Sequence, residues 1–183
     1  MKAPFLALAA LLAQPVLAAD TIAPLALNNP SDWTGFHAGI QIGRMNNALA
    51  YEGRTFLSGG TDNWGLHMGY THDFGPHVLG AEADFNRFRG GNGDLVRIKG
   101  KAGVDLGRYQ PYVVIGLSRL SGDGLTETAP VFGVGGDWKV TDRLTVGLEY
   151  TYQEFEDVLE DEIGVTGYDL EMELTHLRAS WRF

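Results

Sequence analysis

Apolar and polar residues alternate along most of the chain, and this alternation is its strongest structural signal. In "GFHAGIQIG", residues 35–43, Phe36 and Ile40 share one face of a strand, whereas His37 and Gln41 share the other. A period of two residues is typical of a β-strand with one apolar face. The pattern predicts eight strands, at residues 35–43, 64–71, 78–85, 96–106, 111–118, 131–140, 144–153 and 176–183.

The segments between these strands distinguish a barrel from a sandwich, since eight short strands fit either fold. Tight turns at 72–76, 107–110 and 141–143 alternate with linkers that are mostly long and polar. These linkers are residues 44–63, 87–93, 119–128 and 154–167. Short turns at one end, long loops at the other and an even strand number are typical of outer-membrane barrels. The sequence therefore predicts an all-β fold, an eight-stranded antiparallel up-and-down transmembrane β-barrel.

Aromatic residues near the strand ends indicate which face of each strand points outward. They are Trp64, Tyr70, Phe85, Trp138, Tyr150, Tyr152, Trp181 and Phe183. In a water-soluble sandwich the apolar face would form the core, but aromatic residues at strand ends suit the two interfacial girdles of a membrane barrel. We therefore expect the apolar face to contact lipid and the charged face to line the lumen.

The charged face carries nearly equal numbers of acids and bases. The inward acids are Glu82, Asp84, Asp105, Asp137 and Glu149, and the inward bases are Arg97, Lys99, Lys101, Lys139, Arg178 and Arg182. An eight-stranded barrel is just wide enough for its own side chains to fill, and an unpaired buried charge is costly. We expect a structural lumen network of ion pairs formed by Glu82, Asp84, Arg97, Lys99, Lys101, Asp105, Glu149 and Arg178, and a lumen plugged rather than open.

The first residues differ from the rest of the chain. Lys2, the apolar run "FLALAALLA" and the small residues before Ala18 indicate a secretory signal peptide over residues 1–18. Residues 19–32 have no period and predict a periplasmic lead-in, which leaves 33–183 for the barrel. No later segment approaches the roughly 20 apolar residues of a spanning helix.

The cysteine content and the net charge indicate how the protein is stabilised and which partners are excluded. The chain has no cysteine, so an exported protein of this sequence is held by a core, a closed barrel or lipid rather than by disulfides. Its net charge of −9 argues against nucleic acid as a partner.

Three motifs resemble the OmpA-like and opacity-type small outer-membrane β-barrels of Gram-negative bacteria. They are "DWTGFHAGIQIG", "VFGVGGDWKVTDRLTVGLEYTYQEF" and the terminal "HLRASWRF". The resemblance implies an eight-stranded barrel inserted by the outer-membrane assembly machinery. It also implies that a terminal strand ending in an aromatic residue is read by this machinery, so Leu177, Ala179, Trp181 and Phe183 would form a C-terminal insertion signal. It brings no catalytic residues.

The candidate chemical sites are weak. His37, His67 and His176 are expected in the lumen as hydrogen-bonding groups, because zinc needs three or four clustered ligands and no such spacing occurs. An enzyme acting on lipid A would need a serine beside a histidine. Ser118 and Ser121 lie near the outer rim, but the long linkers contain no histidine. We therefore expect no catalytic, cofactor-binding or metal-binding residues.

The acidic segment 154–164 would suit divalent cations or a basic partner, but it lacks the spacing of a calcium loop. We interpret it as a solvated loop.

The sequence favours a non-enzymatic structural or surface-interaction role in the cell outer membrane. The expected partners are outer-membrane lipids, lipopolysaccharide, the assembly machinery during insertion, and an extracellular ligand bound through linkers 44–63, 87–93, 119–128 and 154–167. The alternatives are a narrow pore for small solutes, an outer-leaflet enzyme that modifies lipid A, and a soluble lipocalin-like carrier.

Overall fold

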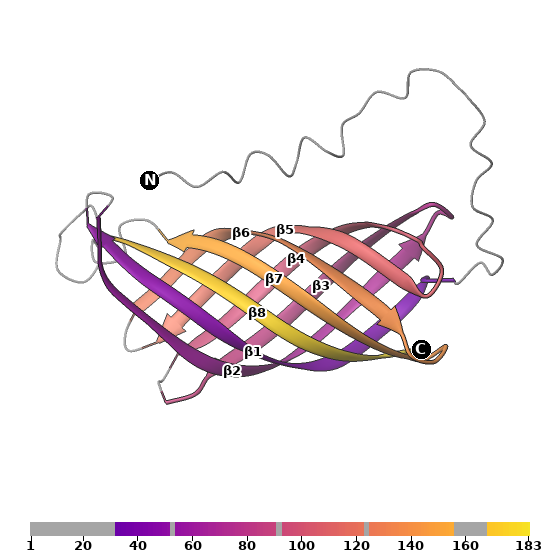
Figure 1. Cartoon of the computed structure of the whole chain (residues 1–183), viewed down its shortest axis with the longest axis horizontal. Coiled ribbons are helices and arrows are strands. Elements are labelled where there is room, and N and C mark those ends of the chain that lie inside the picture. The colour runs from indigo at the N-terminus through magenta and orange to yellow at the C-terminus, as the bar shows by residue number, and fades with distance from the viewer. Residues whose placement is uncertain (1–31, 52–53, 91–92, 123–124, 156–167) are drawn as a thin grey trace, which may run out of the picture.

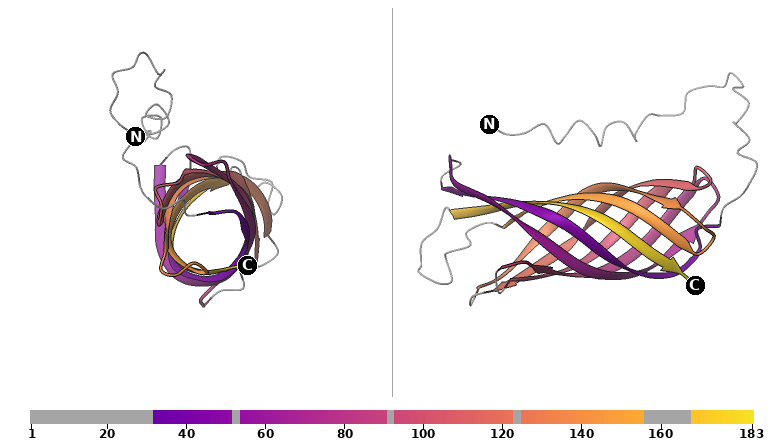
Figure 2. Two further views of the ribbon diagram at one scale, coloured as in Figure 1. Left: turned by 90° about the vertical axis from the view of Figure 1, so that its right-hand side faces the viewer. Right: turned by 60° about the horizontal axis from the view of Figure 1, so that its bottom comes forward.

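The computed structural model describes residues 32–51, 54–90, 93–122, 125–155 and 168–183, which form a closed antiparallel barrel (Figure 1). Its strands are β1 (Gly35–Tyr51), β2 (Arg54–Asp73), β3 (His77–Phe88), β4 (Asp94–Val104), β5 (Tyr109–Gly122), β6 (Leu125–Lys139), β7 (Leu144–Phe155) and β8 (Tyr168–Arg182). Each strand pairs with its neighbour in sequence, and β1 pairs with β8 to close the sheet. Figure 2 shows the round cross-section along the barrel axis. The predicted fold class is confirmed.

Some expectations fall outside this description. The predicted signal peptide, residues 1–18, and the lead-in up to residue 31 lie outside the described residues, as does most of linker 154–167. Among the described residues, no helix is long and apolar enough to cross a membrane.

The outward direction of the apolar face is confirmed within the predicted strands. On β4, Ile98 is 68% exposed, whereas Arg97 beside it is fully buried in the lumen. On β8, Trp181 lies outside and Arg182 inside. A lipid-facing exterior and a charged interior follow from this arrangement.

Seven of the eight strands are longer than predicted, whereas β4 has the predicted length but is shifted by two residues, and two of the expected loops are wrong. β1 and β2 continue through most of residues 44–63, and β5 and β6 through most of 119–128. The physical reason is that the alternation continues there with its polarity exchanged. On β8, for example, the inward residues change from His176 to Leu174 while the outward residues change from Leu177 to Glu173.

An apolar cluster fills the interior at the end of the barrel where the strands extend beyond their predicted bounds. It consists of Met45, Phe88, Leu95, Ala129, Phe155, Met172 and Leu174, with Leu49, Leu120 and Leu170 packed against it. The outward positions over this cluster are mostly polar, so this part of the barrel is built like a water-soluble protein. Segments 44–63 and 119–128 extend the strands at this end, whereas tight turns connect the strands at the opposite end. Because the longer excursions mark the extracellular end of such barrels, the cluster lies on the extracellular side of the membrane.

Inward-facing glycines make room for large lumen side chains. A Cβ on Gly39 would lie 2.6 Å from the His67 Nε2 atom, and one on Gly135 would lie 2.5 Å from the Tyr112 ring. Since real Cβ atoms do not approach so closely, each glycine allows a bulky neighbour to cross the narrow lumen.

The apolar cluster predicts where leucine side chains support the barrel. Leu174→Ala removes a fully buried side chain, and we expect the free energy of unfolding to fall by about 2–5 kcal/mol. Urea unfolding in detergent micelles measures this loss. The matched control is Leu57→Ala, because Leu57 is 62% exposed and its truncation changes stability by less than about 0.5 kcal/mol. Equal losses for the two variants would contradict an apolar extracellular interior.

Candidate functional site

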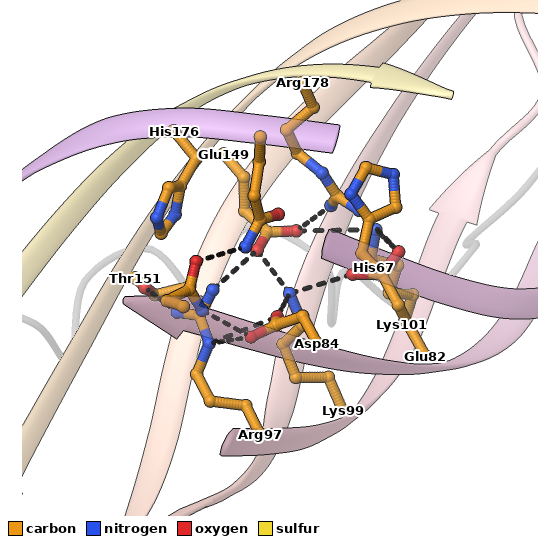
Figure 3. Close-up of polar contacts among 12 residues, drawn as sticks. His67, Glu82, Asp84, Arg97, Lys99, Lys101, Glu149, Thr151, His176 and Arg178 are labelled. Atoms are coloured by element: carbon orange, nitrogen blue, oxygen red, sulfur yellow. Dashed lines mark hydrogen bonds and ion pairs between the residues drawn. The ribbon is translucent and has the colours of Figure 1, made fainter. Parts of the chain in front are cut away.

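The ammonium group of Lys99 lies at the centre of the lumen, in contact with three carboxylates (Figure 3). Its Nζ atom is 2.9 Å from Glu82 Oε1, 2.6 Å from Asp84 Oδ2 and 2.5 Å from Glu149 Oε1. All four side chains are buried. The three carboxylates lie close enough together to share a metal ion, and the ammonium group occupies that position.

Two arginines and a second lysine complete this network around the carboxylates. Arg178 donates to both Glu82 and Glu149, over 2.6 and 2.5 Å. Arg97 donates to Asp84 over 2.8 Å. Lys101 donates to Glu82 over 2.8 Å and lies 3.4 Å from Glu149. The charges therefore connect β3, β4, β7 and β8 across the barrel.

Seven of the eight residues expected in the lumen network meet in this way, and Asp105 does not. Asp105 lies just beyond β4, at the end opposite the apolar cluster, where its Oδ1 accepts from the Gly107 amide over 2.7 Å. The register explains the direct contacts, because Glu82 lies opposite Lys99 and Asp84 opposite Arg97. Asp105 is too far along its strand to reach them.

Trp33 is a functional candidate that the sequence reasoning missed. Its side chain is fully buried at the periplasmic mouth, and its Nε1 atom donates to Asp105 Oδ1 and to the Gly107 carbonyl, each over 3.1 Å. The Lys139 ammonium lies 4.4 Å from its ring centroid, and Arg182 donates to its carbonyl. Trp33 therefore closes the periplasmic end of the lumen, although it precedes the first predicted strand and was not counted among the lumen residues.

The residues beside Trp33 hold this closure in place. The Trp33 amide donates to Asp73 Oδ2 over 3.0 Å, and Lys139 donates to the Asp32 carbonyl over 2.6 Å. Hydrogen bonds from the Thr34 side chain and backbone keep the pKa of Asp32 below its ordinary value. Asp32 thus stays ionised near the cationic Lys139 at neutral pH.

The three lumen histidines have separate hydrogen-bond partners, although the ring centroids of His37 and His67 lie 6.3 Å apart. His37 Nε2 lies 3.3 Å from Glu82, His67 Nε2 is 2.7 Å from Ser180 Oγ, and His176 Nε2 is 2.7 Å from Asn63 Oδ1. The pair of His67 and Ser180 is buried, and His67 Nδ1 has no hydrogen-bond partner among the described residues. The orienting acid of a nucleophilic triad is therefore missing from this pair.

The serines considered for an outer-rim site do not form one. Ser118 is buried and donates to the Ala129 carbonyl over 3.0 Å. Ser121 lies opposite Asp94 and Thr126 near the extracellular end of β5.

The four residues of the expected insertion signal lie on the outer face of β8 and at its end. Leu177, Trp181 and Phe183 are exposed, and Ala179 is partly so. The Phe183 amide donates to the Phe36 carbonyl over 3.0 Å, so the last residue is fixed beside the first strand.

Comparison with known proteins identifies the fold. Residues 5–183 match the family model described as outer membrane protein beta-barrel domain. Neisserial surface protein A is 15% identical, with a TM-score of 0.53 over 82% of this chain and 98% of that chain. The attachment invasion locus protein Ail of Yersinia pestis is 16% identical, with a TM-score of 0.50 over 82% of this chain and 99% of that chain.

A third solved structure has the same architecture. The N-terminal β-barrel domain of Pseudomonas aeruginosa OprF is 14% identical, with a TM-score of 0.51 over 78% of this chain and 97% of that domain. At these identities the similarity concerns the fold alone. No curated protein matches the sequence significantly.

The network predicts a large effect for the loss of one lumen carboxylate. Glu149→Gln leaves Lys99, Lys101 and Arg178 with less opposite charge in a buried site, and we expect the free energy of unfolding to fall by about 3–5 kcal/mol. Guanidinium unfolding from lipid vesicles measures the change. The matched control is Glu154→Gln on the exposed outer face, which we expect to cost less than about 0.5 kcal/mol. A small loss for Glu149→Gln would show that the network is not required for stability.

Proposed function

Because the chain belongs to the outer membrane protein beta-barrel domain family, we propose that it is a closed, non-enzymatic barrel with a structural and surface-interaction role in the outer membrane. The observation that carries this proposal is the filled lumen. Trp33 blocks its periplasmic mouth, the ion pairs around Lys99 fill its middle, and the apolar cluster fills its extracellular part. A barrel filled at three levels supports an envelope and surface role rather than passage of solutes.

The closed lumen predicts the electrical behaviour of the protein. We expect no single-channel steps in a planar lipid bilayer, since ions cannot cross three packed layers. Heat-modifiable migration on a gel, checked on the same preparation, shows that folded barrels are present. The Trp33→Ala variant is also expected to stay silent, because the ion pairs and the apolar cluster remain. Regular conductance steps from folded wild-type protein would instead favour the pore.

The surface-interaction role rests on the part of the barrel beyond the membrane. The segments expected as loops 44–63 and 119–128 are largely strand. A ligand bound there would therefore contact β-hairpins rather than irregular loops. The hairpin of β1 and β2 exposes Leu57 and Tyr51 near its tip. Exposed apolar side chains on a rigid polar wall are typical of protein interaction surfaces, which supports an extracellular protein partner.

We also propose that the terminal strand directs insertion by the outer-membrane assembly machinery. Phe183 is 79% exposed and adds little to packing, so its aromatic ring is free to be recognised before the barrel closes.

The insertion role predicts a defect in assembly that is larger than the loss of one lipid-facing ring explains. Phe183→Ala keeps the backbone hydrogen bond to Phe36 and should lower the yield of folded protein in the outer membrane several-fold in cells. After spontaneous folding into detergent, its free energy of unfolding should fall by no more than that of Phe36→Ala, because each substitution removes one ring from the lipid-facing surface. Normal assembly in cells would contradict the role, and Phe36→Ala, a lipid-facing change at the same level, serves as the control.

A further inference from the structure

The outer wall of the barrel carries a polar groove on β1, β2 and β8. Its volume is about 440 Å³, and it is open to the surroundings on one side. It is lined by Arg44, Asn46, Asn47, Ala48, Ser58, Gly59, Gly60, Glu171 and Glu173. We call this feature the outer-wall groove.

The strand register places the groove on the outside of the barrel. Asn46 lies between Gly60 of β2 and Glu173 of β8, and Ala48 lies between Ser58 and Glu171. Asn46 and Ala48 have the same parity as the exposed Ile42 on the same strand, and side chains two residues apart share a face. The groove therefore faces sideways, toward whatever surrounds the barrel.

The groove begins immediately above the lipid-facing surface. The last apolar outward row is Trp64, Ile42 and Leu177, which are paired in register and exposed. Arg44, two residues beyond Ile42, opens the polar part. At about 3.3 Å per residue, positions 44–48 lie about 7–20 Å along the strand from this apolar row. Because the strands of such barrels tilt by about 35–45°, this corresponds to about 5–16 Å along the membrane normal, the level of the lipid headgroup and of the sugars attached to it.

Small residues form the floor of the groove, and long polar side chains form its walls. A Cβ on Gly60 would lie 3.0 Å from Asn46 Oδ1 and 3.2 Å from the Arg44 Nη2 atom. These two side chains therefore lie over the glycine, with Glu173 on the other side of Asn46. The walls combine amide, guanidinium and carboxylate groups, which donate and accept hydrogen bonds side by side.

The charge of the groove selects against anions. Arg44 is already paired with Asp62 over 3.4 Å, whereas Glu171 and Glu173 both face the groove. Glu154 lies directly opposite Glu171 on β7 and adds a third carboxylate beside it. A phosphate would meet repulsion here, but a neutral polyhydroxyl compound would find paired donors and acceptors.

We propose that the outer-wall groove binds neutral sugar units of the glycolipid that surrounds the barrel in the outer leaflet. The position of the groove beside the membrane indicates that its ligand belongs to the surrounding glycolipid. Its polar, anion-repelling walls indicate that the bound part is a neutral sugar. The inference goes beyond the closed-barrel role, and its failure would leave that role unaffected, because the conductance test does not involve the groove.

The test uses folded full-length mature protein in detergent micelles with EDTA. The probe is the phosphate-free core oligosaccharide released from lipopolysaccharide by mild acid hydrolysis and phosphatase treatment. We expect saturable binding by calorimetry. Gly60→Val fills the floor and Glu173→Gln changes one wall, and each should weaken binding about tenfold or more.

Two control variants keep the test specific. Thr128→Val replaces a hydroxyl group with a methyl group on the opposite outer wall, next to Arg119, and should bind as wild type. Asp94→Asn removes one carboxylate charge, as Glu173→Gln does, but on the outer wall of β4 beside Arg87, away from the groove, and should also bind as wild type. Equal weakening by Asp94→Asn and Glu173→Gln would assign the effect to general charge and overturn the proposal.

Other outcomes overturn the proposal as well. These are absence of oligosaccharide binding, unchanged binding by Gly60→Val, binding of lipid A but not of the oligosaccharide, and binding that requires Mg²⁺. In living cells, a photo-crosslinking residue at Ser58 should yield at least threefold more lipopolysaccharide adduct than one at Thr128. Equal adduct at the two positions would show that the groove does not select the membrane's own glycolipid.

Discussion

The contact of one ammonium group with three carboxylates fixes the arrangement of the barrel. Lys99 can remain charged inside the lumen because Glu82, Asp84 and Glu149 surround it, and none of these acids can move away without leaving an uncompensated buried charge. A slip of one residue in any of the three strands would turn its charges toward lipid. The ion pairs therefore determine the register as well as filling the space.

The barrel is adapted to two solvents along one set of strands. Within the membrane its exterior is apolar and its interior is charged. Beyond the membrane its exterior is polar and its interior is apolar. Leu174 and His176, two residues apart on the same face of β8, mark the change inside. The outer-wall groove begins at the same level, where Leu177 gives way to Thr175 and Glu173 on the outside. A single transition in polarity thus positions the lumen contents, the membrane boundary and the groove.

Much of the fold was predictable from the sequence, because a period of two residues and the alternation of short and long connections are local signals. The pairs of Glu82 with Lys99 and of Asp84 with Arg97 were also accessible, since a short connection fixes their register. The contact of Lys99 with Glu149 spans 50 residues, and only closure of the barrel brings these residues together. Trp33 precedes the first predicted strand, and an apolar side chain was not expected in a lumen of polar side chains. The strand extensions were missed because their outward residues are polar. A segment whose outward residues are polar resembles a polar loop when the prediction considers only the apolar face.

The β1–β2 hairpin and the Trp33 closure lie at opposite ends of the cylinder. A peptide epitope placed between Tyr51 and Arg54 would be carried on a stiff wall above the cell surface, accessible to antibodies. A passenger joined ahead of Asp32 would stay on the inner side of the envelope. The same scaffold can therefore address two compartments, with the choice set by the point of fusion.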